Sequence, residues 1–367
     1  MNSSITAPLA GIPVATGAKP WRWRWVWLIA LVALLCYVPV VLTDRAVFGI
    51  RLSNMQLLNL GLSQVNLMLI AMLGALSLNY LTGCAGLISI GHAAFYAVGA
   101  MTAAITGSQW GWPFPLVLVA AGLAGAVAGL LAGLPSLRVR GLYFVLSTFA
   151  VHYIVVFAFQ EYQFKYFDVV GVPYKPASLG PLDLNSPTRW YFFLLPVVAL
   201  VYWGLHNSLR SREGRAMMAM RDHELATTSA GVDVRILRLK AFAFSSAIAA
   251  VAGALYAYIL SNVTSEFFNI QFAIQFIAMI IIGGMGSLAG SLLGAAVWLL
   301  LPSVISGFAS QASDSTGLLR SILVEHKPQL VQVIFGMMVI LLLIFAPGGI
   351  AGMGAKLRNR ISAWRGK

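Results

Sequence analysis

Long apolar segments recur along this chain from residue 26 to residue 347. A helix needs about 20 apolar residues to cross the hydrocarbon core of a bilayer. The composition agrees with repeated crossing, because 59% of the 367 residues are hydrophobic and only 10% are charged, well outside the range of soluble domains. The chain is therefore predicted to be all-α, a polytopic membrane helical bundle, with no room for a large soluble domain.

Hydropathy predicts ten transmembrane helices. They lie near residues 26–42, 57–77, 84–105, 114–134, 142–159, 190–209, 241–260, 271–283, 287–305 and 331–347. The first helix is expected to be retained rather than cleaved, because no small-residue cleavage site follows it. Three regions result: an N-terminal cytoplasmic tail at 1–24, a membrane domain at 25–347 that contains a long loop at 211–240, and a basic cytoplasmic tail at 348–367.

The distribution of charge sets the predicted orientation. With both termini in the cytoplasm, the cytoplasmic segments carry the whole net charge of +13, and the external segments hold seven basic and seven acidic residues. This asymmetry follows the positive-inside rule. It also accounts for the basic excess as an orientation signal and a contact with lipid headgroups, which excludes a nucleic-acid partner.

Two glycine-rich stretches interrupt the predicted spans. The first, residues 82–100, holds Ser89, Gly91 and His92, and the second, residues 283–296, holds Gly283, Gly284 and Gly286. Irregular backbone in a bilayer is tolerated only inside protein or beside water, so both should line the interior. As a pair they indicate an internal duplication with a pathway at the midplane, although close helix packing through small residues explains each alone.

Polar residues inside the predicted spans are mostly neutral. Asn66, Asn79, Gln271 and Gln275 are candidates for the pathway, while His92 is expected to be a buried neutral side chain bonded to a backbone carbonyl. Nothing near His92 completes a metal site, and the two cysteines, Cys36 and Cys84, are interpreted as small hydrophobic residues. No metal, cofactor or catalytic residue is predicted. Because proton- or sodium-driven carriers usually need a carboxylate in the membrane, the solute is expected to move by an outside energy source.

The loop at 211–240 is the most informative segment outside the spans. A helix is expected from Glu213 to Ser229, ending at a left-handed Gly231, with Asp233 capping the next helix. Its apolar residues are Met217, Met218, Met220, Leu225 and Ala226, flanked by Arg215, Arg221 and Glu224. Such a helix suits a groove on a partner protein, or else the anionic surface of the membrane.

Five blocks of residues follow one another in a distinctive order. They are Gly83, Ala85–Leu87, Ser89 and Gly91–Phe95; Arg140, Gly141, Tyr143 and Phe144; Glu224, Ala226 and Gly231; Ala252–Tyr256; and Gly283–Ser287. Over roughly residues 55–350 these blocks resemble the high-affinity branched-chain amino acid permease family of ATP-binding-cassette (ABC) importers, with Glu224, Ala226 and Gly231 matching the Glu-x-Ala-(x)4-Gly coupling loop of such permeases. Thr227 and Thr228 depart from the small or acidic residues that family members often have there.

The resemblance implies a permease subunit in a bacterial inner membrane, with the permease domain at 25–347. Its partners would be a second homologous permease subunit, two cytoplasmic ATPase subunits and a periplasmic solute-binding protein. The chain has no G-x-x-x-x-G-K-[ST] phosphate loop, so ATP hydrolysis is expected in the separate subunits. Met217, Met220, Arg221, Glu224, Ala226 and Gly231 would then couple that hydrolysis to transport.

Several alternatives stay open at this point. The cargo implied by the resemblance is leucine, isoleucine or valine, but near relatives are assigned to urea, short amides or aromatic acids. An ATP-independent carrier or facilitator would need neither Glu224 nor the methionine-rich face. An intramembrane enzyme would need a catalytic pair across helices, such as His92 or His152 with Ser89 or Ser147.

Overall fold

The computed structural model describes residues 39, 61–139, 141–167, 171–179, 182–311, 327–345 and 348–354. The chain divides into two units, residues 1–52 and 53–367, and apart from Pro39 every described residue belongs to the second unit. The predicted N-terminal tail, nearly all of the first predicted span, Arg140 and residues 355–367 of the basic tail lie outside the described residues.

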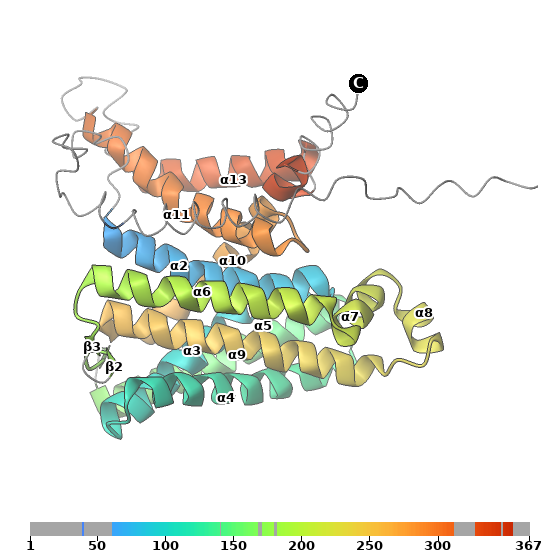
Figure 1. Ribbon diagram of the computed structural model, residues 1–367, viewed down its shortest axis with the longest axis horizontal. Coiled ribbons are helices and arrows are strands. Elements are labelled where there is room, and N and C mark those ends of the chain that lie inside the picture. The colour runs from blue at the N-terminus through green and yellow to red at the C-terminus, as the bar shows by residue number, and fades with distance from the viewer. Residues whose placement is uncertain are drawn as a thin grey trace, which may run out of the picture. The chain divides into compact units, whose positions relative to one another are not determined.

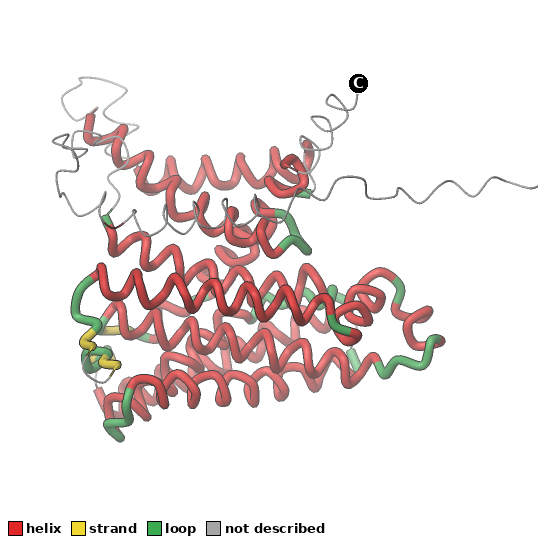
Figure 2. Tube along the Cα trace, in the orientation of Figure 1, coloured by secondary structure: helices red, strands yellow, loops and turns green. Residues whose placement is uncertain are grey.

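Helices dominate the described chain, as predicted (Figures 1 and 2). They are α2 (Leu62–Leu78), α3 (His92–Ala103), α4 (Phe114–Gly133), α5 (Leu142–Phe167), α6 (Pro187–Arg210), α7 (Arg212–Asp222), α8 (Glu224–Ser229), α9 (Val234–Leu260), α10 (Ile270–Gly283), α11 (Leu288–Gln311) and α13 (Lys327–Phe345). Two π-helical turns, η2 (Asn79–Cys84) and η3 (Ala104–Gln109), extend α2 and α3. Two 3₁₀ turns are η4 (Leu134–Leu137) and η6 (Ser265–Phe268).

Two pairs of two-residue strands complete the described structure. Strand β1 (Val172–Pro173) pairs antiparallel with β4 (Asn262–Val263), and β2 (Ser178–Leu179) pairs antiparallel with β3 (Leu182–Asp183). In Figure 1, β2 and β3 lie at the opposite end of α6 and α9 from α7 and α8. These strands close turns between helices, so the all-α prediction is confirmed.

Six helices among the described residues are long and apolar enough to cross a membrane. They are Leu62–Cys84, Phe114–Leu137, Leu142–Phe167, Pro187–Arg210, Val234–Leu260 and Leu288–Ile305. Two shorter apolar helices, Ile270–Gly283 and Val331–Leu341, add to them. The predicted span at 84–105 is wrong at its start, because η2 ends at Cys84 and α3 begins only at His92. Left-handed Gly86, at φ +75°, lies in the intervening non-helical segment.

The predicted cytoplasmic loops meet at one end of the helices. Arg221 of the loop at 211–240 donates to the carbonyl of Gly83, and Arg238 donates to the carbonyl of Ser136 at 2.8 Å. At the other end Ser108 donates to the carbonyl of Pro173 at 2.9 Å, close to the β1–β4 pair. The segments that we assigned to one side of the membrane are therefore also neighbours in space.

Helix α9 is the centre of the packing, since its small residues let α3 and α4 approach closely. A Cβ at Gly129 of α4 would lie 1.8 Å from Ser246 Oγ, and one at Gly99 of α3 would lie 1.8 Å from the carbonyl oxygen of Ala250. The contact is reciprocal, because a Cβ at Gly253 of α9 would lie 2.1 Å from the carbonyl oxygen of Tyr96. Backbone therefore lies against backbone at these crossings.

We expect Gly99→Ala to destabilise the bundle by about 1–3 kcal/mol, because the added methyl group must push α3 away from a fixed backbone oxygen. Gly204→Ala on α6 is the matched control, since a Cβ there meets no atom within 4 Å and alanine favours the helix. Thermal unfolding of both variants in detergent measures the difference. Equal midpoints for the two variants would contradict this account of the α3–α9 contact.

Candidate functional site

The loop at 211–240 folds into two short helices rather than the single predicted helix. Ser211 caps α7, its hydroxyl oxygen accepting the Gly214 N–H at 3.1 Å. His223 then turns the chain into extended backbone, at φ −149° and ψ 92°. Its own N–H closes α7 on the carbonyl of Ala219, and its carbonyl accepts the Thr227 N–H at 3.1 Å to open α8. The prediction of continuous helix from Glu213 to Ser229 is therefore wrong at His223.

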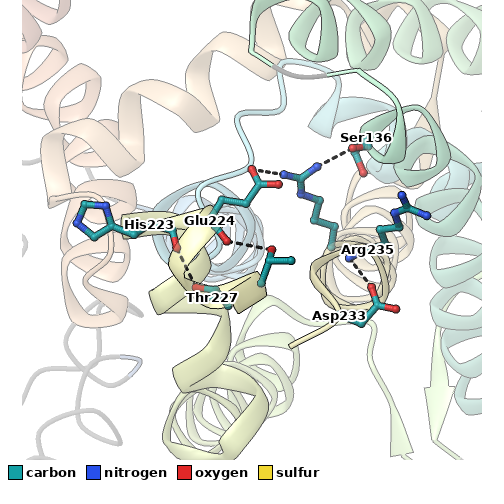
Figure 3. Close-up of polar contacts among 8 residues, drawn as sticks. Ser136, His223, Glu224, Thr227, Asp233 and Arg235 are labelled. Carbon is teal, nitrogen blue, oxygen red and sulfur yellow. Dashed lines mark hydrogen bonds and ion pairs between the residues drawn. The ribbon is translucent and has the colours of Figure 1, made fainter. Parts of the chain in front are cut away.

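The end of α8 has the caps that the sequence predicts. Gly231 is left-handed, at φ +82°, and donates to the carbonyl of Thr228, while the Val232 N–H reaches the carbonyl of Thr227. These two bonds form a Schellman motif, which satisfies carbonyls at a helix end. Asp233 Oδ1 then accepts the Arg235 N–H at 2.9 Å (Figure 3) and the Ile236 N–H at 3.3 Å, starting α9. The short connection fixes α8 against the start of the long central helix.

The methionine face is oriented differently from our expectation. Met217 and Met220 are only 2% and 5% exposed, because α7 packs against α6 and η2. The large apolar side chains that are exposed on the two helices are Met218 and Leu225, at 38% and 81%. Met217 and Met220 thus hold α7 to its own chain, and they are not available to a partner groove.

Arg221 extends from α7 to the first glycine-rich stretch. Its guanidinium donates to the carbonyl of Gly83. Its stem passes so close to left-handed Gly86 that a Cβ there would lie 2.7 Å from Arg221 Cγ. A Cβ at Gly286, in the second stretch, would lie 3.0 Å from Arg221 Nη1. One side chain of the loop therefore contacts both glycine-rich stretches.

Asn79 joins the two stretches directly. Its Nδ2 donates to the carbonyl of Ser287 at 2.9 Å, and its Oδ1 accepts the Gly286 N–H at 2.8 Å. A Cβ at Gly83 would lie 2.4 Å from the Gly286 nitrogen, so only glycine permits this approach. We call this contact between residues 79–86 and 283–287 the glycine junction. Asn79 and Gly83 are buried, whereas Gly86 and Gly286 are exposed, so the two stretches meet at a partly exposed contact and only part of each lies in the interior.

The remaining glycines of the second stretch pack α10 against its neighbours. A Cβ at Gly283 would lie 2.0 Å from the carbonyl oxygen of Gly290 in α11. Gly284, at φ +112°, ends α10 and lies against the carbonyl of Gly348. These two positions are explained by close packing.

Glu224 forms an ion pair inside the chain. Its carboxylate lies 2.6 Å from the guanidinium of Arg238, which also donates to the carbonyl of Ser136 at 2.8 Å (Figure 3). The Arg238 side chain is 10% exposed and that of Glu224 is 28% exposed. The pair ties α8 to α9 and to η4. Sequence reasoning missed Arg238, because its partners are 14 and 102 residues away along the chain.

His92 is buried and bonded, but to a different partner from the one expected. Its Nε2 lies 2.7 Å from Ser77 Oγ rather than from a backbone carbonyl, and Ser77 in turn donates to the carbonyl of Gly74 at 2.8 Å. A Cβ at Gly91 would lie 2.1 Å from the carbonyl oxygen of Thr148. Ser89 is also buried. These contacts place Ser89, Gly91 and His92 in helix packing, and His92 is paired with Ser77 rather than Ser89.

The other pathway candidates separate into two groups. Asn66 is buried, and its Nδ2 donates to the carbonyl of Pro187 at 2.8 Å, so it links α2 to α6. Gln271 and Gln275 of α10 instead line cavities. One of about 880 Å³ lies between α10, α11 and α13, and another of about 570 Å³ lies beside η6. Both of these cavities therefore lie along α10, whereas a third, of about 410 Å³, lies beside Gly86, Glu224 and Arg238.

We expect Asn79→Ala to destabilise the protein by about 1–3 kcal/mol, since it removes a buried side chain and both of its hydrogen bonds, to the Gly286 N–H and to the Ser287 carbonyl. Asn207→Ala, at an exposed position on α6, is the control and should change stability by less than about 0.5 kcal/mol. Thermal unfolding in detergent compares the two variants. A midpoint unchanged by Asn79→Ala would show that the junction does not depend on this side chain.

Comparison with known proteins identifies the family to which this chain is similar. Residues 61–343 match the family model described as the branched-chain amino acid transport system permease component. The high-affinity branched-chain amino acid transport system permease proteins LivM of Salmonella typhimurium and Escherichia coli are each 30% identical over 283 residues, which is 69% of this chain. The match spans 65% of the length of each of those proteins.

A more distant relative is the probable branched-chain amino acid transport permease protein LivM of Methanocaldococcus jannaschii, 25% identical over 241 residues, 64% of this chain and 67% of that protein. No solved structure matches the chain. The family model covers every described helix from α2 to α11 and most of α13. The protein therefore belongs to the branched-chain amino acid transport system permease family.

Proposed function

We propose that this chain is the permease subunit of an ATP-binding-cassette importer that carries branched-chain or related amino acids across the bacterial inner membrane. Its partners would be a second homologous permease subunit, two cytoplasmic ATPase subunits and a periplasmic solute-binding protein, with both termini in the cytoplasm. Family membership supports the transport role. The names of the LivM proteins support the choice of cargo.

The observation that carries the coupling role is the contact of Arg221 with the glycine junction. Helix α7 lies at the end of the helices where the charged loops gather, and its arginine reaches the point at which α2 and α11 are joined through Asn79. A partner that moves α7 therefore pulls on the Gly83 carbonyl and on both stretches at once. Such a rigid-body link can convert closure of an ATPase dimer into a change of access along α10.

The surface that would receive the ATPase is small and exposed. Met218 of α7 and Leu225 of α8 present apolar side chains, and Ala226 beside them is also exposed. Glu224 does not contribute to this surface as a docking charge in our proposal. Its pair with Arg238 instead holds α8 rigidly on α9, so that a force applied at Leu225 is transmitted to the bundle.

Replacing the charge of Glu224 tests this proposal. In vesicles that contain the whole importer, we expect Glu224→Gln to lower ATP-dependent leucine uptake at least tenfold, because the neutral amide no longer pairs with the largely buried Arg238 guanidinium. Glu213→Gln is the matched control, since it removes an ion pair to Lys240 in which both side chains are more than half exposed. Such surface pairs contribute little, so uptake by this variant should stay within twofold of wild type.

Co-purification supplies the second half of the same test. The proposal requires two ATPase subunits and a second permease to elute with the wild-type chain in mild detergent. If the chain purifies alone and uptake continues without ATP, the importer proposal is wrong and the chain is a facilitator. Uptake of labelled urea in place of leucine would keep the importer and change its cargo.

A further inference from the structure

Two cavities lie on either side of one layer of side chains at the start of α10. Tyr256 of α9 and Phe272 and Gln275 of α10 line both cavities, and we call these three residues the aromatic–amide layer. The outer cavity, of about 570 Å³, lies beside η6, at the same end as β4. The inner cavity, of about 140 Å³, lies among α2, α3, α9, α10 and α11. These three side chains are therefore a wall that the two cavities share.

The outer cavity is rich in polar groups. Besides the layer, its lining includes the carboxylate of Glu266, the amides of Asn269 and Gln271, and the hydroxyl of Thr264. A carboxylate beside aromatic rings attracts an ammonium group, and side-chain amides donate hydrogen bonds to a carboxylate. This lining therefore matches both charges of a zwitterion.

The inner cavity is mostly apolar. Its lining includes Leu67, Ile70, Ala71, Met279 and Leu299. The hydroxyl of Tyr96, which also borders it, already donates to the carbonyl of Ile70 at 3.1 Å. A cavity of about 150 Å³ lined by aliphatic and aromatic residues accommodates a benzene-sized group, so this space suits an aliphatic side chain and excludes a charged head.

The layer itself is held by ring contacts. The Phe272 ring lies 5.7 Å from that of Tyr256, 5.6 Å from that of Tyr96 and 4.9 Å from that of Phe276, centroid to centroid. These edge-to-face and tilted contacts fix the aromatic side. Gln275 also borders the larger cavity of about 880 Å³ between α10, α11 and α13, so its amide lies where three open spaces meet.

We propose that the aromatic–amide layer and the inner cavity form a solute-binding site for a small zwitterion with an aliphatic side chain. The head would lie against Glu266, Gln271 and Gln275, and the side chain would lie beyond Phe272, toward Ala71 and Met279. This inference rests on the proposed transport function. It adds a site in the permease that selects solutes by the size of their side chain. The wall at Ala71 and Met279 sets the upper limit on that size.

Changing the size of the inner cavity tests the site. The assay measures ATP-dependent uptake of labelled leucine, alanine and phenylalanine by vesicles that contain the whole importer, each solute being delivered at saturating concentration. Ala71→Leu fills the cavity, so we expect leucine uptake to fall at least tenfold relative to alanine uptake. Ala199→Leu makes the same exchange at an exposed position on α6 that lines neither cavity. This control should leave the ratio within twofold of wild type.

A second variant changes the volume in the opposite direction, so the test survives if Ala71→Leu does not fold. Met279→Ala enlarges the inner cavity, and we expect phenylalanine uptake to rise at least fivefold relative to leucine uptake. Wild-type uptake with unchanged ratios in both folded variants would overturn the proposed site while leaving the importer intact. A wild-type importer that moves none of the three solutes would overturn the proposed amino-acid cargo, and with it the site.

The polar half of the site has a test of its own. Glu266→Gln removes the carboxylate of the outer cavity, so we expect the KM for leucine uptake to rise at least fivefold with the leucine-to-alanine ratio unchanged. Glu161→Gln, which neutralises an exposed carboxylate on α5 that we also assign to the outer side, is the control. A KM that rises equally in both variants would assign the effect to general surface charge and reject a role for Glu266 in binding.

Discussion

Every backbone N–H and carbonyl inside a bilayer needs a partner within the protein, and this requirement shapes the end of the bundle at which the two glycine-rich stretches meet. The chain breaks its helices twice, between η2 and α3 and between α10 and α11, and each break frees backbone groups that a straight helix would have used. Asn79 satisfies two of them and Arg221 a third. The same hydrogen bonds hold the two non-helical segments against each other. The bonds that satisfy the backbone therefore also join the two halves of the bundle to the loop at 211–240.

The packing around α9 has a related cause. Lipid tails are as apolar as leucine, so helices in a membrane associate through close packing rather than through burial of apolar surface. Gly99, Gly129 and Gly253 let backbones meet at distances that a methyl group would prevent. The helix that makes these contacts begins at Asp233, directly after the Schellman motif of α8, and ends near the aromatic–amide layer at Tyr256. A single rigid element thus connects the two ends of the molecule at which we propose coupling and binding.

Much of this arrangement could be predicted from local sequence, and the failures have a common reason. Apolar length identified the six long apolar helices of the described chain. Gly231 and Asp233 identified the end of α8 and the start of α9, because a helix end depends on a few neighbouring residues. The burial of Gly83, Gly91 and His92 followed from the intolerance of lipid for irregular backbone, but Gly86 and Ile88 of the same stretch are exposed. The break at His223, the serine partner of His92 and the pair of Glu224 with Arg238 depend on tertiary contacts, which no local pattern reports. The burial of Met217 and Met220 depends likewise on contacts with α6 and η2. In the sequence, the aromatic residues of the aromatic–amide layer cannot be distinguished from other apolar residues of a membrane helix.

The glycine junction also has a consequence for how the protein is made. Asn79 and Ser287 are 208 residues apart, so at synthesis rates of roughly 5–20 residues per second the first stretch waits about 10–40 s for the second to leave the ribosome. During that interval α2 and α3 are already in the membrane, with polar groups of η2 that only the later helices can satisfy. The early helices must therefore be sheltered by the insertion machinery or by water until α10 and α11 arrive, and assembly of this bundle is committed only near the end of translation.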